Sequence, residues 1–309
     1  MPMPHQVQQQ LIKRRLVGKE GSERLRELRS ALAQLPNYKN GPYADLRKWV
    51  MAEIEATRAR ARVVQRDSLS VRREGVAQIA LVGPPNAGKS SLLQALSEIQ
   101  IKIGDYAFTT LRPVPALVRV RGVLVQFVEI PGLVEGAVED RGGGRALLGV
   151  LRGADAIVYC QDAAGSPTDL SIVRKEVAAA GIDLPAIIAA TKMDDADEPA
   201  LGRLAAAFDD IEIVPVSILD DTSLNRLREA AWRLLDLMCV YLRRGGLVDE
   251  KPLALPAGAT VSDVARHIHK ELASSSRGGR IWGPSARFEG QLVGLAHEVR
   301  DGDVIEIIA

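Results

Sequence analysis

The sequence is short of cysteine and of long apolar runs, and each shortage excludes a class of protein. Cys160, at the end of an apolar run, and Cys239, on a predicted helix, are the two cysteines among 309 residues. They are too few for a disulfide scaffold, so we expect buried thiols in a reducing compartment. No stretch approaches the roughly 18 consecutive apolar residues that span a membrane, and the start Met1–Gln6 lacks the apolar core of a signal peptide. These absences predict a cytoplasmic protein that neither crosses a membrane nor is secreted.

The sequence also has little net charge, +1 at neutral pH, but that charge is unevenly distributed. Residues 1–74 hold 16 Lys and Arg against 8 Asp and Glu, residues 75–242 hold 15 against 22, and residues 243–309 hold 9 of each. A hydrophobic content of 47% in 309 residues is enough for the cores of two or three domains. We therefore predict three parts with these boundaries: a basic helical region, a central domain and a small C-terminal domain.

The basic N-terminal region is predicted to form two helices, at about 22–35 and 42–70, because apolar residues recur at helical spacing in both. Four arginines crowd the second helix: Arg58, Arg60, Arg62 and Arg66. A helical hairpin of this kind suits contact with RNA phosphates, where each neutralised phosphate adds salt-dependent affinity. A solvated charged face without a partner is the open alternative.

A complete phosphate-binding loop opens the central domain. Residues 83–90 read Gly-Pro-Pro-Asn-Ala-Gly-Lys-Ser, and they lie between an apolar strand-like run and a helix-like segment, the context that G-x-x-x-x-G-K-[ST] requires. The glycines let backbone N–H groups approach the phosphates closely. Lys89 is expected to bind the β- and γ-phosphates and the Ser90 hydroxyl to ligate magnesium. The nucleotide-binding residues predicted here are Pro85, Asn86, Ala87, Gly88, Lys89, Ser90 and Ser91.

Two downstream segments supply the remaining phosphate and metal contacts. Thr110 lies in a segment that is a switch I candidate, placed to reach the γ-phosphate and the metal. A β-rich run then ends in Glu129-Ile130-Pro131-Gly132, which brings an acid to the magnesium and a backbone N–H to the γ-phosphate. The predicted metal ligands are Ser90, Thr110 and Glu129, and the predicted catalytic residues are Lys89, Thr110, Gly132 and Asn86.

The base is predicted to be guanine. A buried-strand run at 186–190 leads into Thr191-Lys192-Met193-Asp194, a [NT]-K-x-D loop. The Asp194 carboxylate is suited to accept hydrogen bonds from the ring N–H and the exocyclic amine of guanine, a donor pair that adenine lacks. Lys192 would lie along the base plane, and Ser217 would close the pocket. The expected ligands are therefore GTP and GDP with Mg²⁺.

Taken together, these residues resemble the Obg class of GTPases, most closely the developmentally regulated GTP-binding (DRG) branch with a C-terminal TGS domain. The resemblance rests on the phosphate loop and on three segments: Asp105–Pro113, Ile130–Ala137 and residues 247–309. It implies a P-loop GTPase domain at 75–242, whose doubly wound, mostly parallel α/β sheet agrees with helical segments at 170–180, 201–208 and 223–237. It also implies a ubiquitin-like β-grasp TGS domain at 243–309, and ribosome or RNA partners. We expect a monomer.

The C-terminal segment indicates a small β-grasp from its own residues as well. It contains a strand-like run at 252–255, a capping box at Thr260 and Asp263 that opens a helix through about Leu272, and a closing strand at 304–308. The residues alone support an interaction domain, and the partner follows from the resemblance.

Hydrolysis is expected to be slow. Leu133 occupies the position of the water-positioning glutamine of Ras-type GTPases, and leucine neither orients nor deprotonates water. Unaided GTPases turn over at about 10⁻⁴ to 10⁻² s⁻¹. Asn86 resembles the asparagine that holds potassium in cation-activated GTPases, so we hypothesise that K⁺ replaces an arginine finger; a simple turn-forming role is the alternative.

Two other functions stay open. An ATPase of the same class is one, although Asp194 argues against it. The second is an interaction module with a silent nucleotide site. Glu129 stands where aspartate is usual and Thr191 where asparagine is commoner, and together with Leu133 they keep this second alternative open.

Overall fold

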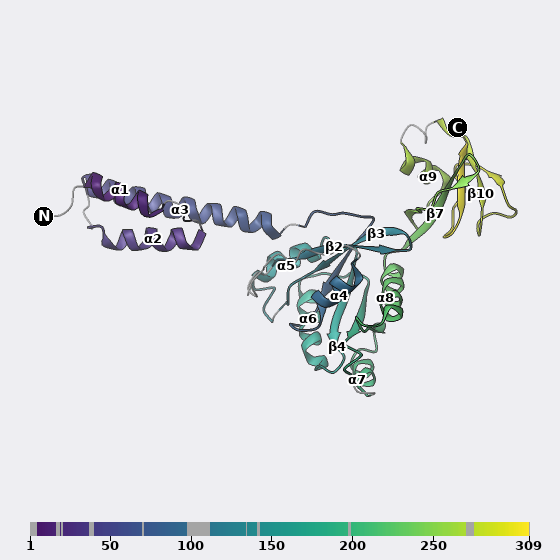
Figure 1. Cartoon of the computed structure of the whole chain (residues 1–309), viewed down its shortest axis with the longest axis horizontal. Helices are drawn as coiled ribbons and strands as arrows, with labels where there is room; N and C mark the ends of the chain where they lie inside the picture. The colour runs from purple at the N-terminus through teal and green to yellow at the C-terminus, as the bar shows by residue number, and fades with distance from the viewer. Residues whose placement is uncertain are drawn as a thin grey trace. The chain divides into compact units, whose positions relative to one another are not determined.

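The computed structural model describes residues 5–16, 19, 21–36, 40–69, 71–97, 112–133, 135–140, 143–196, 199–269 and 275–308. The contacts between residues divide the chain into two compact units, Met1–Ser70 and Val71–Ala309, and Figure 1 colours the first unit purple to blue. Each unit has its own hydrophobic core. Among the described residues, no helix has both the length and the apolar character needed to cross a bilayer.

The first unit consists of helices α1 (His5–Leu16), α2 (Gly21–Gln34) and α3 (Pro42–Leu69). The two helices predicted from the sequence are confirmed as α2 and α3, whereas α1 has no counterpart in the prediction. It packs because Ile12 and Leu16, one turn apart, join a core with Leu28 and Val50. The predicted hairpin is therefore a three-helix arrangement. The side chains of the four arginines on α3 lie outside the described part of the chain.

The second unit begins with a six-stranded sheet in the order β2-β3-β1-β4-β5-β6. Its strands are β1 (Gln78–Val82), β2 (Val114–Val120), β3 (Val123–Glu129), β4 (Ala156–Asp162), β5 (Ala186–Thr191) and β6 (Ile213–Pro215). β2 is antiparallel to β3, and the other neighbours are parallel, which confirms the predicted mostly parallel sheet. All five residues of β1 are buried, because parallel sheets are covered on both faces.

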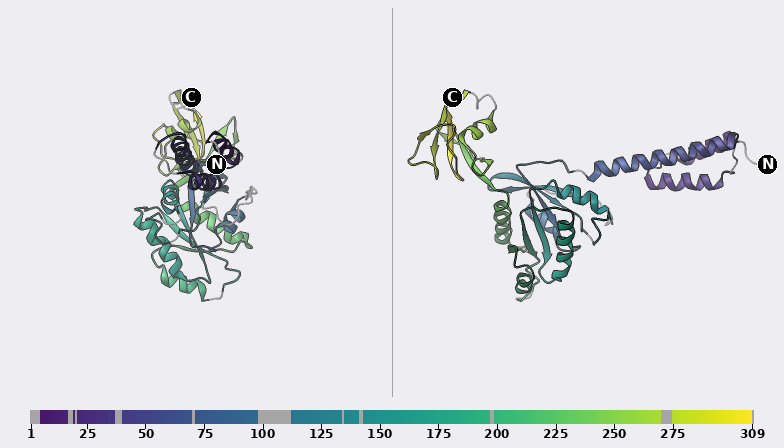
Figure 2. Two further views of the ribbon diagram at one scale, coloured as in Figure 1. Left: turned by 90° about the vertical axis from the view of Figure 1, so that its left-hand side faces the viewer. Right: turned by 180° about the vertical axis from the view of Figure 1, so that it is seen from behind.

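Helices pack on both faces of this sheet (Figure 2). They are α4 (Lys89–Leu96), α5 (Gly144–Leu151), α6 (Pro167–Ala179), α7 (Ala200–Ala207) and α8 (Asp221–Arg233). Ile79 of β1 shares a core with Leu92 of α4 and Leu227 of α8. Because side chains alternate along a strand, Ala80 faces the opposite layer. The carboxyl ends of the parallel strands meet at one edge, where open α/β sheets bind ligands.

A second sheet, in the order β11-β10-β12-β7-β8, forms the C-terminal part, and β9 pairs with β7. Its elements are β7 (Leu237–Arg244), β8 (Leu247–Val248), β9 (Leu253–Pro256), α9 (Val261–Ile268), β10 (Gly278–Trp282), β11 (Gln291–Val293) and β12 (Val304–Ile308). β7 and β12 are parallel, and their other neighbours are antiparallel, in agreement with the predicted β-grasp. The predicted capping box is confirmed, since Thr260 and Asp263 bond reciprocally, although α9 ends at Ile268, before the predicted Leu272.

One helix prediction is wrong at its end. The sequence predicts a helix at 223–237 and places Cys239 on a helix, but α8 ends at Arg233 and Cys239 lies in β7. Pairing of β7 with both β9 and β12 overrides the local preference. The predicted domain boundary at residue 243 falls inside this strand. Both cysteines are buried and unpaired as predicted, and burial raises the pKa of Cys160 to about 12 and that of Cys239 to about 11.

The turn between β2 and β3 contacts the C-terminal part. Arg121 Nε donates to Glu229 on α8 (2.9 Å), and its Nη1 donates to Asp301 before β12 (3.0 Å). Asp301 in turn accepts from the backbone N–H of Cys239 (2.7 Å). Gly122 packs so closely that an added Cβ would lie 2.9 Å from Pro252. The hairpin that ends at the predicted metal ligand of β3 is therefore bonded to the second sheet.

Candidate nucleotide-binding site

The phosphate loop connects β1 to α4. Asn86 (φ 63°) and Gly88 (φ 77°) have left-handed backbone conformations, which asparagine and glycine adopt at the least cost. A Cβ at Gly83 would lie 2.2 Å from the carbonyl oxygen of Cys160 on β4. The two glycines of the motif are therefore required for different reasons. Gly83 leaves no room for a side chain, and Gly88 adopts a left-handed backbone conformation.

Lys89, the first residue of α4, is buried within this loop. Its Nζ donates to the carbonyl oxygens of Gly83 (2.9 Å) and Pro84 (2.8 Å). An ammonium group has three N–H donors, and a phosphate oxygen is a suitable acceptor for the third. Burial lowers the pKa of Lys89, and the nearby Glu129 carboxylate opposes that effect. The side chain is thus held where a helix N-terminus already favours anions.

Ser90 and Glu129 meet directly. The Ser90 hydroxyl donates to Glu129 Oε1 at 2.6 Å, although the two residues lie on α4 and at the end of β3. The register of the sheet places Glu129 beside Leu81 of β1, so the longer glutamate side chain spans the distance to the helix. Hydroxyl and carboxylate oxygens are the ligands that Mg²⁺ prefers. The residues present therefore fit the predicted magnesium site.

The segment after β3 approaches the phosphate loop. A Cβ at Gly132 would lie 3.3 Å from Pro85 Cγ, which places Gly132 against the loop. Leu133 is only 3% exposed, so its side chain belongs to the protein interior. Thr110, the predicted switch I threonine, lies outside the described residues, as do residues 105–111 as a whole.

Farther along this segment, Glu176 of α6 accepts hydrogen bonds from the backbone N–H groups of Gly136 (2.8 Å) and Val138 (3.0 Å). Arg145 Nε donates to the Val138 carbonyl (3.0 Å). Sequence reasoning misses Glu176, because a single acidic residue on a helix gives no local signal for a contact with a distant loop. The side chains of Glu176 and Arg145 therefore bond the loop that follows Gly132, the predicted donor to the γ-phosphate.

Thr191 joins the predicted base loop to the phosphate loop. It is buried at the end of β5 with 4% exposure. Its hydroxyl lies 2.9 Å from the Ala87 carbonyl oxygen and 3.1 Å from that of Gln161. Threonine at this position therefore still spans to the phosphate loop with a donor.

Lys192 follows with a left-handed backbone (φ 56°). Its Nζ pairs with Asp162 Oδ2 at 2.6 Å, and Asp162 Oδ1 accepts from the Ala164 N–H (3.0 Å). Sequence reasoning misses Asp162. Its signal is a polar residue at the end of a buried parallel strand, β4, which neighbours β5.

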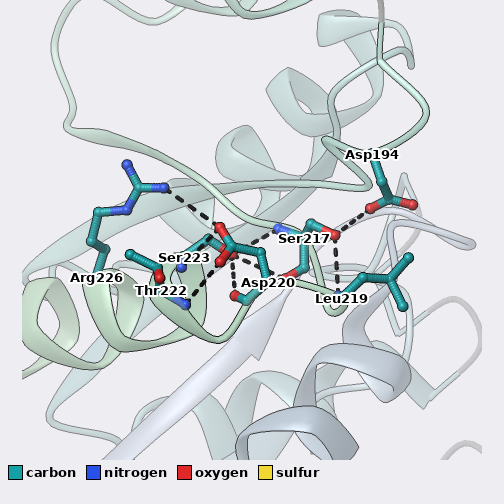
Figure 3. A network of polar contacts seen from close by, with 7 residues as sticks. All are labelled: Asp194, Ser217, Leu219, Asp220, Thr222, Ser223 and Arg226. Atoms are coloured by element: carbon teal, nitrogen blue, oxygen red, sulfur yellow. Dashed lines mark hydrogen bonds and ion pairs between the residues drawn. The ribbon is translucent and has the colours of Figure 1, made fainter.

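Asp194 and Ser217 also meet, as Figure 3 shows. The Ser217 hydroxyl donates to Asp194 Oδ1 at 2.6 Å and accepts from the Leu219 N–H at 3.1 Å. This hydrogen bond is the main cause that lowers the pKa of Asp194, and a backbone hydrogen bond adds to it. The carboxylate is therefore ionised at neutral pH, as an acceptor for two donors of a base must be.

A pocket of about 490 Å³ lies where these loops converge. Its lining consists of Asn86, Ala87, Gly88, Lys89, Ser90, Ser91, Glu129 and Lys192. Lining residues thus come from the phosphate loop, the end of β3 and the base loop. The sequence motifs, far apart along the chain, contribute to one site.

Comparisons with known proteins agree with this geometry. Residues 78–192 match the family of 50S ribosome-binding GTPases, and residues 238–309 match the TGS domain. An uncharacterized GTP-binding protein of Halobacterium salinarum is 28% identical over 78% of this chain and 85% of its own length. Developmentally-regulated GTP-binding protein 2 of Homo sapiens is 25% identical over 78% of this chain and 85% of its own length. The chain thus carries a GTPase domain and a TGS domain, and over most of its length it is similar to developmentally regulated GTP-binding proteins. Among solved structures, a GTP-binding protein from Sulfolobus solfataricus in complex with GDP is similar at a TM-score of 0.42 and 17% identity, over 75% of this chain and 65% of that chain.

The match over residues 78–192 identifies the central domain as a GTP-binding GTPase domain, and Mg²⁺ accompanies the nucleotide in such proteins. Eight of the predicted nucleotide-binding and metal residues line this pocket, whereas Pro85, Thr191, Asp194 and Ser217 are not among its lining residues. Ser217 and Asp194, from separate loops, are joined by a hydrogen bond. Asp162, which pairs with Lys192, and Glu176, which bonds the loop after Gly132, are contacts that the sequence motifs do not identify.

Proposed function

We propose that the protein is a GTP-hydrolysing molecular switch that reads guanine through Asp194. The observation that best supports this proposal is the bond from Thr191 Oγ1 to the Ala87 carbonyl (2.9 Å). It couples the base loop to the phosphate loop at a fixed distance, as recognition of a whole nucleotide requires. Lys192 and Ser217 would complete the base pocket.

The proposed chemistry is electrostatic. Lys89 would neutralise charge that develops between the β- and γ-phosphates, and the Gly132 N–H would donate to the γ-phosphate. Ser90, Thr110 and Glu129 would hold Mg²⁺, which supplies charge stabilisation to the transferred phosphoryl group. Contacts to the γ-phosphate would order the two switch segments, and hydrolysis would release them.

We propose a slow intrinsic rate, about 10⁻⁴ to 10⁻² s⁻¹. Leu133 is buried and carries no polar atom to orient water. Asn86 lines the pocket and would hold a potassium ion that supplies the missing positive charge. A simple turn-forming role for Asn86, which its left-handed backbone also suits, is the competing explanation.

We propose that the switch acts in the cytoplasm as a monomer, on RNA or the ribosome. The N-terminal region has twice as many basic as acidic residues. On the TGS sheet, Arg280 and Leu292 are an exposed cross-strand pair, and the Arg243 guanidinium lies 4.3 Å from the Trp282 ring centroid. Arginine and aromatic side chains on an open sheet suit stacking with bases of RNA.

The test is nucleotide turnover by the full chain, with GTP compared with ATP, in potassium and in sodium. Asp194→Asn should shift preference from guanosine to xanthosine nucleotides. Asp195→Asn, the neighbouring exposed carboxylate, is the matched control and should keep GTP preference. Preference for ATP would support the ATPase alternative, and GTP binding without turnover would support the silent interaction module.

The partner proposal has its own test, which is RNA binding at several salt concentrations. Affinity should fall as salt rises, because phosphate neutralisation releases counterions. Arg280→Ala should weaken RNA binding without changing GTP turnover. Affinity that is independent of salt would contradict a phosphate-contacting surface.

A further inference from the structure

The first turn of α8 lies directly behind the proposed guanine pocket. Asp220 caps the helix: its carboxylate accepts from the N–H groups of Thr222 (2.9 Å) and Ser223 (3.2 Å), the usual role of aspartate at this position. The loop between β6 and this cap is short and contains Ser217. Figure 3 shows Ser217 between Asp194 on one side and this first turn on the other.

The Ser223 hydroxyl lies within hydrogen-bond distance of both backbone polar groups of Ser217. It accepts from the Ser217 N–H at 3.1 Å. The same hydroxyl lies 3.0 Å from the Ser217 carbonyl oxygen and 2.8 Å from that of Asp220, and its single hydrogen serves one of them at a time. Ser223 is only 3% exposed, so water does not readily replace these bonds.

The backbone of Ser217 sets the direction of its hydroxyl. Ser217 Oγ accepts from the Leu219 N–H (3.1 Å), and this leaves its hydrogen directed at Asp194 (2.6 Å). Asp194 itself is exposed, so the Ser217 hydroxyl restricts a side chain that packing does not hold. A carboxylate already fixed in its binding orientation loses less entropy when a base arrives.

We propose that Ser223 is a positioning residue for guanine recognition, acting through Ser217 on Asp194. The proposal rests on the role of Asp194 proposed above. Ser223 is buried, with 3% exposure, and bonds the backbone of Ser217, so we assign it no direct contact with base or phosphate. It determines how rigidly the pocket presents its carboxylate, and therefore the affinity for guanine nucleotides.

The competing explanation is that Ser223 only stabilises the start of α8. Serine often bonds nearby backbone groups at helix starts. In that case its loss would lower thermal stability without a specific effect on base recognition. Coupling between Ser223 and Ser217 in nucleotide affinity distinguishes the two explanations.

The test is the GDP affinity of the full chain, measured by titration calorimetry for S223A, S217A and the double variant. We expect S223A to weaken GDP binding about tenfold, comparable to one lost hydrogen bond. Because Ser223 acts through Ser217, the double variant should bind GDP no more weakly than S217A alone. Effects that multiply in the double variant would overturn the proposal.

Two variants serve as controls. S171A removes a hydroxyl that donates to a helix carbonyl on α6, that of Pro167 (3.1 Å), and should leave GDP affinity unchanged. S223T keeps a hydroxyl and should restore most of the affinity. A loss in S223A no larger than that in S171A would overturn the proposal, and so would a fall in kcat at saturating GTP without any change in GDP affinity.

Failure of this inference is distinguishable from failure of the proposed function. Unchanged GDP affinity in D194N would contradict the guanine-reading role of Asp194. Weak binding in D194N together with normal binding in S223A would overturn the Ser223 inference alone. Where S223A does not fold, S223C keeps the volume with a much weaker donor, and normal GDP affinity in S223C overturns the inference as well.

Discussion

Replacing Thr191 by valine tests the connection between the base loop and the phosphate loop. Valine keeps the size and β-branching of threonine but removes the hydroxyl. Thr191 is 4% exposed, and its two acceptors belong to Ala87 and Gln161, each 1% exposed. The single hydroxyl hydrogen serves one of these carbonyls, so the variant leaves one buried acceptor without this donor.

The expected loss of stability follows from the one buried carbonyl that loses its donor. A buried polar group without its partner costs about 1–3 kcal/mol, so we expect T191V to lose that much free energy of unfolding. For a unit of this size, each kcal/mol lowers the melting temperature by about 2–4 °C. GDP affinity should also fall, by about tenfold if about 1.4 kcal/mol of the loss is felt in the bound state.

The assay is urea unfolding of the full chain with and without GDP, alongside the T168V variant. Thr168 is exposed on α6, so T168V should change the free energy of unfolding by less than about 0.5 kcal/mol. Equal losses in the two variants would refute the reasoning about the buried hydroxyl. A loss of stability with unchanged GDP affinity would refute the coupling of the two loops.

Three further predictions concern the pocket and the thiols. Because the Ser217 hydrogen bond holds the pKa of Asp194 below its usual value, the carboxylate stays ionised. The ratio of GDP to ADP affinity should therefore not change between pH 7 and pH 5, since the terminal phosphate, which titrates at about pH 6, is common to both ligands; a fall in this ratio would show that Asp194 takes up a proton there. GTP turnover should be faster in potassium than in sodium, by a factor smaller than the about 10³ to 10⁵ by which a supplied arginine raises the rate. The N86A variant should abolish the difference, and equal rates in both salts would exclude a role for potassium. Cys160 and Cys239 are buried with pKa values raised to about 12 and about 11, so a thiol reagent at pH 8 should modify neither in the native protein and both after denaturation.

The success of the sequence predictions depended on how local each feature is. The phosphate loop is eight consecutive residues, and it connects β1 to α4, the strand and helix that the motif implies. The capping box at Thr260 is equally local. The sequence places Cys239 on a helix, and that prediction is wrong because the partners of β7, the strands β9 and β12, are distant in sequence. Local propensity does not contain that pairing, and α1 likewise depends on the core that it shares with α2 and α3.

The sequence by itself determined the residue types that a GTPase site needs, their order along the chain and the alternation of strands and helices that supports them. Only the tertiary structure decided which of these residues touch. The bonds from Ser90 to Glu129, from Lys192 to Asp162 and from Ser217 to Asp194 join residues 23 to 39 positions apart. The physical reason is the parallel sheet, whose strands all end at one edge and so bring their loops together there. Which side chains then meet depends on the register of the sheet and on the first turn of α8, where Ser223 is buried. No single segment of the sequence determines either of these.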